Sequence, residues 1–281
     1  MTIETKEITK SSRLKNKKLH PKRQLTRKIM LFTSFLLFPI TIFYLSPYLS
    51  LLGPAMGTIT GALIIFGSLF IISLFFGRVF CSYVCPMGGM QDAMVFIRPK
   101  RVKLKTIFVK WLVFTPWLLV LIILPFMTLP EWQGIDFFAG IGGKVDFFGI
   151  EGILVKGISI LSLHGLMIYY IIIFLMLILG FAVGKRSFCH HVCWIAPFMI
   201  VGRWISNLIR IPSLRLKPEN EKCIDCNRCD RICPMSLNVS DLVQRGDMEH
   251  NSCILCGECI EECPKNVIHY TFSSYKKAKV T

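Results

Sequence analysis

The chain has 281 residues, a formal net charge of +16 and a mean hydropathy of +0.55, and 53% of its residues are hydrophobic. This is the composition of a membrane protein and excludes an ordinary soluble domain. The basic residues flank apolar stretches, so we expect no nucleic-acid partner. The twelve Cys fall into four clusters, unlike a secreted disulfide framework, and they indicate a reducing compartment.

Residues 1–29 contain ten Lys or Arg but only two acidic residues, Glu4 and Glu7. Such a segment is too charged and too poor in apolar residues to fold alone. A signal peptide is the alternative, but the apolar run that follows is too long and lacks a small-residue cleavage site. We therefore predict a disordered basic tail in the cytoplasm.

Four apolar stretches follow, at residues 30–52, 57–77, 107–129 and 158–183. As helices that rise about 1.5 Å per residue, each is long enough to cross roughly 30 Å of hydrocarbon. Pro39 and Pro47 are expected to kink the first one. The sequence therefore predicts four transmembrane helices.

Basic residues gather between these stretches. Residues 78–106 hold six Lys or Arg against one acid, residues 184–222 hold seven against two, and residues 130–156 hold two Lys against four acids. By the positive-inside rule we predict a multi-pass protein of the cell (cytoplasmic) membrane with both termini in the cytoplasm.

The motif Phe-Cys-x-x-Val-Cys occurs twice, 108 residues apart, and each copy follows two apolar stretches. It places Cys81 and Cys85 in the first half, and Cys189 and Cys193 in the second. Two Cys at i and i+4 share one helix face. If the halves meet, four sulfurs converge as a metal or third redox site, or cycle as dithiol and disulfide. The alternative is that they only pack helix ends as small apolar residues.

His190 and His191 lie inside the second Cys pair. They are candidates to hydrogen-bond a quinone or to ligate a metal; the alternative is that they merely cap a helix end. Each Cys motif is followed by a short amphipathic run, at 89–97 and 194–211, which we expect to lie as a helix in the cytoplasmic interface.

The remaining eight Cys form the spacing C-x2-C-x2-C-x3-C-P twice. This spacing is typical of two [4Fe–4S] clusters, in which the fourth Cys of each run ligates the other cluster. A zinc site, usually two separated CxxC pairs, fits poorly. The predicted ligands are Cys223, Cys226, Cys229 and Cys263 for the first cluster, and Cys253, Cys256, Cys259 and Cys233 for the second.

Between the two runs, residues 238–244 suggest a short helix capped by Asn238 or Ser240, and residues 263–270 suggest a closing strand. The module is locally acidic, with eight acids and four basic residues in 223–272. The predicted fold is an α-helical membrane protein, with four transmembrane helices in two tandem repeats and a small α+β two-cluster ferredoxin domain. The predicted segments are the tail 1–29, the repeats 30–106 and 107–211, the cytoplasmic ferredoxin domain 212–272 and a basic tail 273–281.

The combined pattern resembles the NapH/NosR-type membrane polyferredoxins, and is most similar to the NapH-like quinol dehydrogenase membrane component. The resemblance is carried by the two Cys pairs, by Pro86 and by the eight ferredoxin Cys. In this chain Trp194 follows the second pair where the family usually has Pro. The resemblance implies electron transfer between the quinone pool and a reductase subunit or another redox protein.

We therefore expect an iron–sulfur protein with two [4Fe–4S] clusters that uses quinone or quinol as substrate, a quinol dehydrogenase-type subunit in a membrane. Two alternatives stay open. A maturation factor would use the Cys pairs to reduce or deliver a metal to a client metalloenzyme, and a redox-sensing regulator would use the clusters to control expression.

Overall fold

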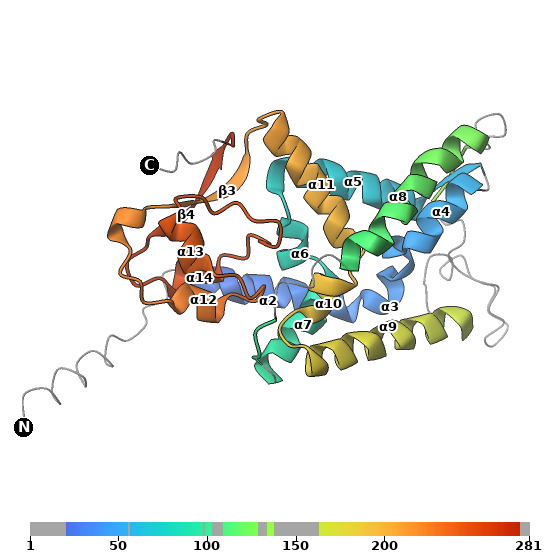
Figure 1. The fold of residues 1–281 in the computed structure, drawn as a ribbon. Helices are drawn as coiled ribbons and strands as arrows, with labels where there is room; N and C mark the ends of the chain where they lie inside the picture. The colour runs from blue at the N-terminus through green and yellow to red at the C-terminus, as the bar shows by residue number, and fades with distance from the viewer. Residues whose placement is uncertain are drawn as a thin grey trace, which may run out of the picture.

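We analysed a computed structural model, which describes residues 21–55, 57–97, 99–102, 109–128, 134–137 and 163–275. The predictions made for residues 1–20, for most of the loop 130–156 and for the tail beyond 275 lie outside the described residues. In Figure 1 the ferredoxin module occupies one end of the molecule, and a helical body that carries the two Cys pairs forms the rest.

Long helices form the helical body. They are α2 (Pro21–Leu36), α4 (Pro47–Ala55), α5 (Gly61–Phe76), α7 (Pro86–Ile97), α8 (Val109–Thr128), α9 (Leu163–Ala182) and α11 (Ile195–Leu208). Short elements join them. They are α3 (Phe38–Thr41), the 3-10 turn η1 (Phe43–Leu45), α6 (Val79–Tyr83), α10 (Ser187–His191) and a parallel pair of strands, β1 (Thr58–Thr60) and β2 (Gly134–Asp136). Helix α5 packs on α11, α2 on α7 and α4 on α8 (Figure 1).

Within the described residues, no helix is both long and apolar enough to cross a membrane. This finding overturns the predicted fold of four transmembrane helices and the predicted multi-pass membrane localisation. In the first apolar stretch α2 ends at Leu36, the short α3 and η1 follow, and α4 begins at Pro47. Pro39 and Pro47 lack the N–H that continues a helix. In the second, α5 has 16 residues and is about 24 Å long, short of the roughly 30 Å required.

The predicted disordered tail is wrong for residues 21–29. These residues form the first turns of α2, which lies beside the ferredoxin module (Figure 1). Arg23 pairs with Glu261 at 3.1 Å, so partners from the far end of the chain compensate the charge that argued against folding.

The ferredoxin module combines an antiparallel pair of strands, β3 (Ser213–Pro218) and β4 (Ile268–Ser273), with short helices. These are η6 (Asn220–Lys222), α12 (Arg228–Ile232), α13 (Val239–Gln244) and α14 (Glu258–Glu262). The predicted helix and closing strand are confirmed. Asn238 is the N-cap residue of α13, as predicted, but its side chain makes no capping hydrogen bond. Instead, Asp230 accepts hydrogen bonds from both the backbone N–H and the hydroxyl of Ser240, each at 2.7 Å.

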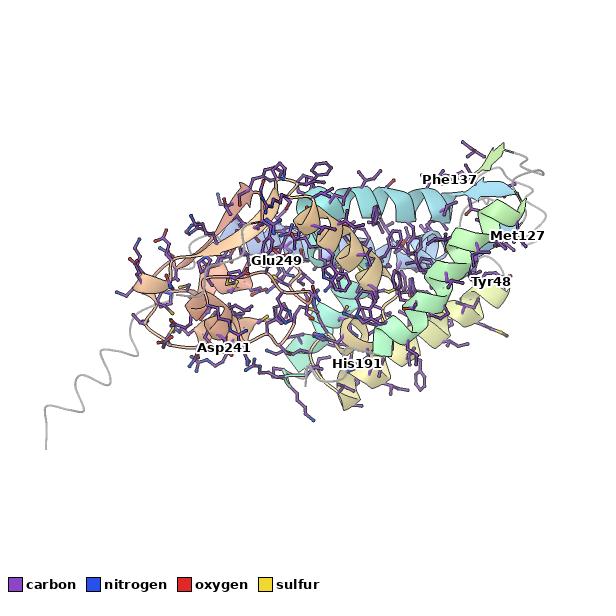
Figure 2. All side chains as sticks on the ribbon, turned by 45° about the horizontal axis from the view of Figure 1, so that its top comes forward. Tyr48, Met127, Phe137, His191, Asp241 and Glu249 are labelled. Carbon is purple, nitrogen blue, oxygen red and sulfur yellow. The ribbon has the colours of Figure 1, made fainter. Side chains whose placement is uncertain are left out.

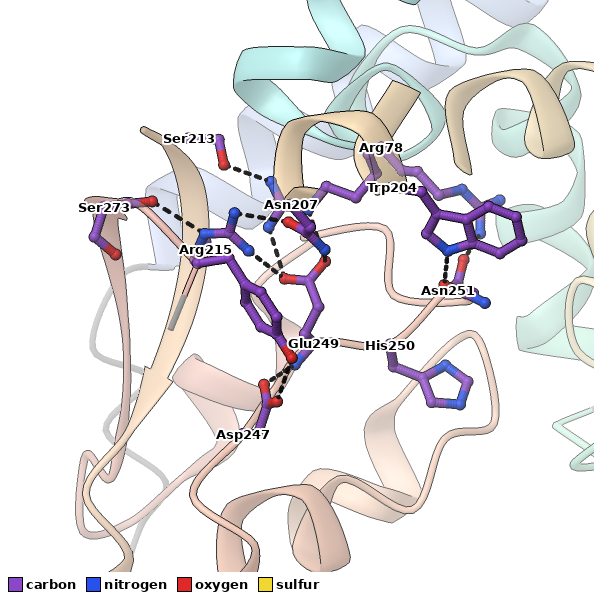
Figure 3. A network of polar contacts seen from close by, with 12 residues as sticks. Arg78, Trp204, Asn207, Ser213, Arg215, Asp247, Glu249, His250, Asn251 and Ser273 are labelled. Carbon is purple, nitrogen blue, oxygen red and sulfur yellow. Dashed lines mark hydrogen bonds and ion pairs between the residues drawn. The ribbon is translucent and has the colours of Figure 1, made fainter. Parts of the chain in front are cut away.

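A polar network joins the module to α11 (Figure 3). The carboxylate of Glu249 accepts hydrogen bonds from Arg203 at 2.7 and 2.8 Å and from Arg215 at 2.8 Å, and Arg215 also donates to Asn207 at 2.7 Å. Burial acts to raise the pKa of Glu249, but Arg203 and then Arg215 outweigh it and hold that pKa below its ordinary value. The ferredoxin module is therefore fixed against the helical body.

A second network centres on Asp92 in α7. It accepts from Arg27 of α2 at 2.8 Å and from Arg186, just before α10, at 2.6 Å, and the other end of Arg27 reaches Glu258 at 2.5 Å. Burial acts to raise the pKa of Asp92, but Arg186 and then Arg27 outweigh it, so the pKa is lowered. One carboxylate thus holds two buried guanidinium groups.

We predict that Asp92→Asn lowers the free energy of unfolding by about 3–5 kcal/mol at pH 7, because it leaves the buried Arg186 without its carboxylate and Arg27 with Glu258 alone. The folded-state pKa of Asp92 is depressed, so its stabilisation is complete above the unfolded pKa of about 3.9 and is lost as the pH falls through the folded value. The difference between parent and variant in urea unfolding should therefore shrink in acid.

The matched control is Asp241→Asn, on the exposed surface of α13 (Figure 2), which should leave the unfolding curve nearly unchanged. Equal curves for Asp92→Asn and the parent at pH 7 would contradict the prediction.

Candidate metal centres

The predicted ligands of the second cluster surround one cavity. Cys233, Cys253, Cys256 and Cys259 line a space of about 410 Å³, a volume that includes its open mouth. The other walls are mostly apolar, with Leu216 and Met248 among them. The structure therefore brings this set of four thiols together.

The predicted ligands of the first cluster surround a separate cavity of about 400 Å³, lined by Cys223, Cys226, Cys229 and Cys263. Cys233 thus faces the cavity of the later run, and Cys263 that of the earlier run. This is the crossed arrangement that the spacing predicts, although the role of each thiol as a ligand stays a prediction.

The two Cys runs share the same backbone turns. Asp225 and Asn227 have φ of 48° and 52°, and thirty residues later Leu255 and Gly257 have φ of 54° and 75°. Such alternation turns successive backbone N–H groups toward one concave side, a geometry that binds anions and occurs at iron–sulfur sites. Leu255 adopts this conformation without the freedom of glycine, at a cost of about 1–2 kcal/mol. The strained turn indicates a functional constraint.

Within the described part of the chain, no three His, Cys, Asp or Glu side chains converge closely enough to hold a single metal ion. Each ferredoxin set of four thiols instead borders a cavity, which fits a cluster whose irons each take one thiolate. Burial raises the pKa of Cys256 to about 12 and of Cys253 to about 11, so cluster binding must displace protons. The residues present therefore fit [4Fe–4S] clusters better than zinc.

Helix α2 covers the second site. Gln24 donates to the carbonyl of Cys256 at 3.0 Å and Arg23 to that of Gly257 at 3.1 Å, while Arg27 pairs with Glu258. Sequence reasoning missed these three residues. The sequence did carry a signal for this contact, because residues 1–29 are basic and the ferredoxin module is acidic.

The two Cys pairs lie in the same buried core of the protein. All four thiols belong to one buried core, with exposed fractions of 7% for Cys81 and Cys189 and 3% for Cys85 and Cys193. Burial raises the pKa of Cys85, and Cys81, Cys193 and Cys189 add to that effect, so the four groups lie within electrostatic reach of one another. We call them the core sulfur site.

The i, i+4 spacing predicts that the two Cys of each pair share one continuous helix face. The structure does not have this arrangement. Cys81 and Cys189 lie in α6 and α10, whereas Cys85 and Cys193 come after these helices end. The backbone N–H of Cys85 bonds to the carbonyl five residues earlier at 2.9 Å, and that of Cys193 does the same at 3.0 Å. The two halves thus close with the same turn, even though Pro follows one and Trp the other.

His190 is fully buried beside Cys189. Burial lowers its pKa to about 3, and Arg78 and Lys110 contribute, so the ring is neutral. His191 is half-buried, and its Nδ1 lies 2.8 Å from the carbonyl of Ser187. Neither ring lines either ferredoxin cavity. Their predicted quinone or metal roles stay predictions.

Family comparisons agree with these sites. The 4Fe-4S binding domain family matches residues 58–105 and 166–212, each of which contains one Cys pair, and the 4Fe-4S dicluster domain family matches residues 222–268, which contain the eight ferredoxin Cys. The chain therefore contains segments that match two families of [4Fe–4S] binding domains.

Three curated relatives are similar to this chain. The uncharacterized protein MJ0749 of Methanocaldococcus jannaschii is 28% identical over 62% of this chain and 58% of its own length. The putative electron transport protein YccM of Escherichia coli is 23% identical over 65% of this chain and 48% of its own length. The methylamine utilization ferredoxin-type protein MauN of Paracoccus denitrificans is 26% identical over 67% of this chain and 60% of its own length. The matches thus span less than two thirds of each of these relatives, and no solved structure matches the chain.

These comparisons confirm the predicted [4Fe–4S] binding character of the chain. The specific NapH-like identity is not among the similarities found.

We predict that Cys233→Ser and Cys253→Ser remove the same cluster, because both thiols border one cavity although they belong to different runs. Cys263→Ser should instead match Cys223→Ser. Iron per chain should fall by one [4Fe–4S] equivalent in each variant, and EPR of the reduced protein should sort the four variants into these two pairs. Sorting by sequence run, with Cys233→Ser matching Cys223→Ser, would contradict the crossed assignment.

Proposed function

We propose that this protein relays single electrons between a two-electron donor, a quinol, and a respiratory reductase or other redox partner. The relay runs through the core sulfur site, then the second ferredoxin cluster, then the first. The observation that carries the proposal is that three sulfur sites adjoin in this order while their exposure increases. The core thiols are buried, the second set is buried or half-buried, and the first set includes the exposed Cys226.

The core sulfur site adjoins the second ferredoxin site through the turn between α5 and α6. A side chain placed on Gly77 would lie 3.3 Å from Leu255, a residue of the second cluster loop. The next residue, Arg78, donates to the carbonyl of Asn251 at 2.7 Å, two residues before Cys253. Arg186 donates to the carbonyl of Cys81, a residue of the core sulfur site, at 3.2 Å.

The two ferredoxin sites adjoin through their crossed thiols. Cys229 lies in α12 and Cys233 directly after it, yet they line different cavities. Helix α12 packs against α14. In α14, Cys259 lies within the helix and Cys263 directly after it, as Cys229 and Cys233 do in α12. Only three residues of chain therefore separate a ligand of one proposed cluster from a ligand of the other.

The outer end of the relay is the first ferredoxin site. Cys226 is exposed, and the neighbouring Ile224 is 56% exposed. This is where a soluble or subunit partner would exchange electrons. The names of two relatives, a putative electron transport protein and a ferredoxin-type protein, agree with such a role.

A quinol as donor is supported by the resemblance to quinol dehydrogenase components and by stoichiometry. A quinol releases two electrons, whereas each cluster accepts one, so neighbouring clusters in series suit such a donor.

The burial of the core thiols argues against the maturation alternative. A site that delivers metal to a client must open to it, whereas these four thiols are 3–7% exposed and packed in a core. A resident cofactor fits this environment better. No observation favours the regulatory alternative.

The test is reduction of the purified, reconstituted protein by a menaquinol analogue, followed by EPR under anaerobic conditions. We expect cluster signals to appear with the parent. In Cys81→Ser/Cys189→Ser, reduction by dithionite should persist while reduction by the quinol slows at least tenfold, because the entry site is lost. Absence of any signal change with quinol in the parent would overturn the quinol proposal. An iron content of the double variant equal to that of the parent would remove the core site from the relay.

A further inference from the structure

The second cluster loop, residues 253–259, is held from outside by three side chains. Each donates a hydrogen bond to one of three consecutive backbone carbonyls of the loop. The donor and acceptor residues are Tyr270 to Leu255 at 2.7 Å, Gln24 to Cys256 at 3.0 Å and Arg23 to Gly257 at 3.1 Å. The donors belong to α2 and β4, so segments far apart in the sequence meet at this loop. We call these three side chains the loop clamp.

The loop clamp packs tightly against the backbone of the loop. The guanidinium of Arg23 lies 5.0 Å from the centroid of the Tyr270 ring. A side chain placed on Gly257 would lie 2.6 Å from both the Tyr270 hydroxyl and Nη2 of Arg23, which is closer than such atoms can approach. Gly257 also has a φ of 75°, a conformation that favours glycine. The clamp therefore reaches the loop at a position where glycine is required.

The orientation of the Gln24 amide is fixed by its other partner. Its oxygen accepts a hydrogen bond from Nε of Arg27 at 2.7 Å, and a guanidinium has donors but no acceptor. The amide nitrogen of Gln24 therefore faces the carbonyl of Cys256. Gln24 is only 8% exposed, so this contact is shielded from water.

Each held carbonyl also fixes the N–H group of the same peptide unit. The peptide unit is planar and trans, so its C=O and N–H point in opposite directions. Because the carbonyls of Leu255 and Cys256 are held outward, the N–H groups of Cys256 and Gly257 are turned inward. Cys256 and Gly257 both line the second cavity. The two N–H groups therefore point toward the space that the four thiols surround.

These two N–H groups have no acceptor in the protein. Within the described residues, neither the N–H of Cys256 nor that of Gly257 donates to a backbone carbonyl or to a side-chain oxygen. Buried N–H groups without an acceptor are rare in native proteins, because each costs as much as a lost hydrogen bond. A [4Fe–4S] cluster in this cavity supplies acceptors, since its sulfides and its thiolate ligands carry negative charge.

The first cluster loop lacks such a clamp. The equivalent carbonyls, thirty residues earlier, are those of Asp225 and Cys226. In the part of the chain that the structure describes, no side chain donates to the carbonyl of Asp225. The carbonyl of Cys226 receives the exposed Arg231 at 3.5 Å, a weak hydrogen bond. The clamp is therefore a difference between two loops that share the same backbone turns.

We propose that Gln24 and Tyr270, assisted by Arg23, are positioning residues for the second ferredoxin cluster. They hold two N–H groups of the loop toward the cluster sulfurs, and this raises the reduction potential of the cluster. Reduction adds negative charge, which N–H groups stabilise, and hydrogen bonds to the sulfurs are one of the factors that set the potential of such clusters. The proposal rests on the cofactor assignment made above for the second ferredoxin site.

The test is a redox titration of the reconstituted full-length protein with dithionite, monitored by EPR. Tyr270→Phe removes only a hydroxyl, and Gln24→Met removes the amide but keeps the length of the side chain. Each should shift the reduction equilibrium of the second cluster about three- to tenfold toward the oxidised form, the range that one net hydrogen bond carries. A tenfold shift lowers the potential of a one-electron couple by about 59 mV. The first cluster should keep its parent potential.

The matched controls are Tyr275→Phe, whose hydroxyl donates to Asp247 at 3.0 Å, and Thr26→Val, on the exposed side of α2. Each removes one hydrogen bond away from the loop, and neither should shift a potential. Loosening that merely admits water would raise the potential of the second cluster, because water stabilises the more highly charged reduced state.

A second-cluster potential in Tyr270→Phe and Gln24→Met that equals the parent's, or lies above it, would therefore overturn the proposal. An equal downward shift of both clusters would overturn it too, since the clamp holds one loop alone.

A second readout is the rate at which each cluster loses iron to a chelator. The second cluster should lose iron several-fold faster in Tyr270→Phe and Gln24→Met, because a loop that is not held opens more easily, and the first cluster should lose it at the parent rate. Equal rates in the parent and both variants would contradict the positioning role.

Cys253→Ser separates this inference from the assignment on which it rests. If Cys253→Ser keeps the iron content of the parent, the second cluster is not held where we assign it, and both ideas fail. If Cys253→Ser loses a cluster while Tyr270→Phe and Gln24→Met leave the potential unchanged, the cluster exists and only the role of the clamp is wrong. The titration uses dithionite, so failure of a quinol as donor would not change its outcome.

Discussion

The structure depends on the compensation of charge in a crowded interior. Asp92 binds Arg27 and Arg186 at once, and through them it joins α2, α7 and the segment that leads into α10. Because Arg27 also reaches Glu258, the same contact fixes the second ferredoxin loop. Without this carboxylate, the buried Arg186 would lose its ion-pair partner and Arg27 would keep only Glu258.

The ferredoxin module is therefore a fixed part of the molecule. Glu249 holds it to α11 through Arg203, and Arg101 donates to the carbonyls of Ser236 and Leu237, just after Cys233. Most of these contacts run from basic residues of the helical body to oxygens of the module. An electron relay benefits from such rigidity, because transfer between sites requires that their separation stay constant.

The sequence predicted the ferredoxin sites well because their signal is local. A cluster loop is specified by Cys spacing, and the crossing of Cys233 and Cys263 follows from that spacing, so the two cavities appeared where expected. The apolar stretches carried a weaker signal. Their length predicted continuous membrane-crossing helices, but Pro39, Pro47 and the strand Thr58–Thr60 divide the first two into shorter elements.

The sequence by itself determined the eight ferredoxin thiols, the internal repeat and the iron–sulfur character of the chain, because each follows from the spacing of Cys residues along the chain. Only the tertiary structure decided which residues surround them. Arg27 meets Glu258 across 231 positions, and Arg78 meets Asn251 across 173. A buried charge finds its partner through packing in three dimensions, and no spacing along the chain encodes that meeting.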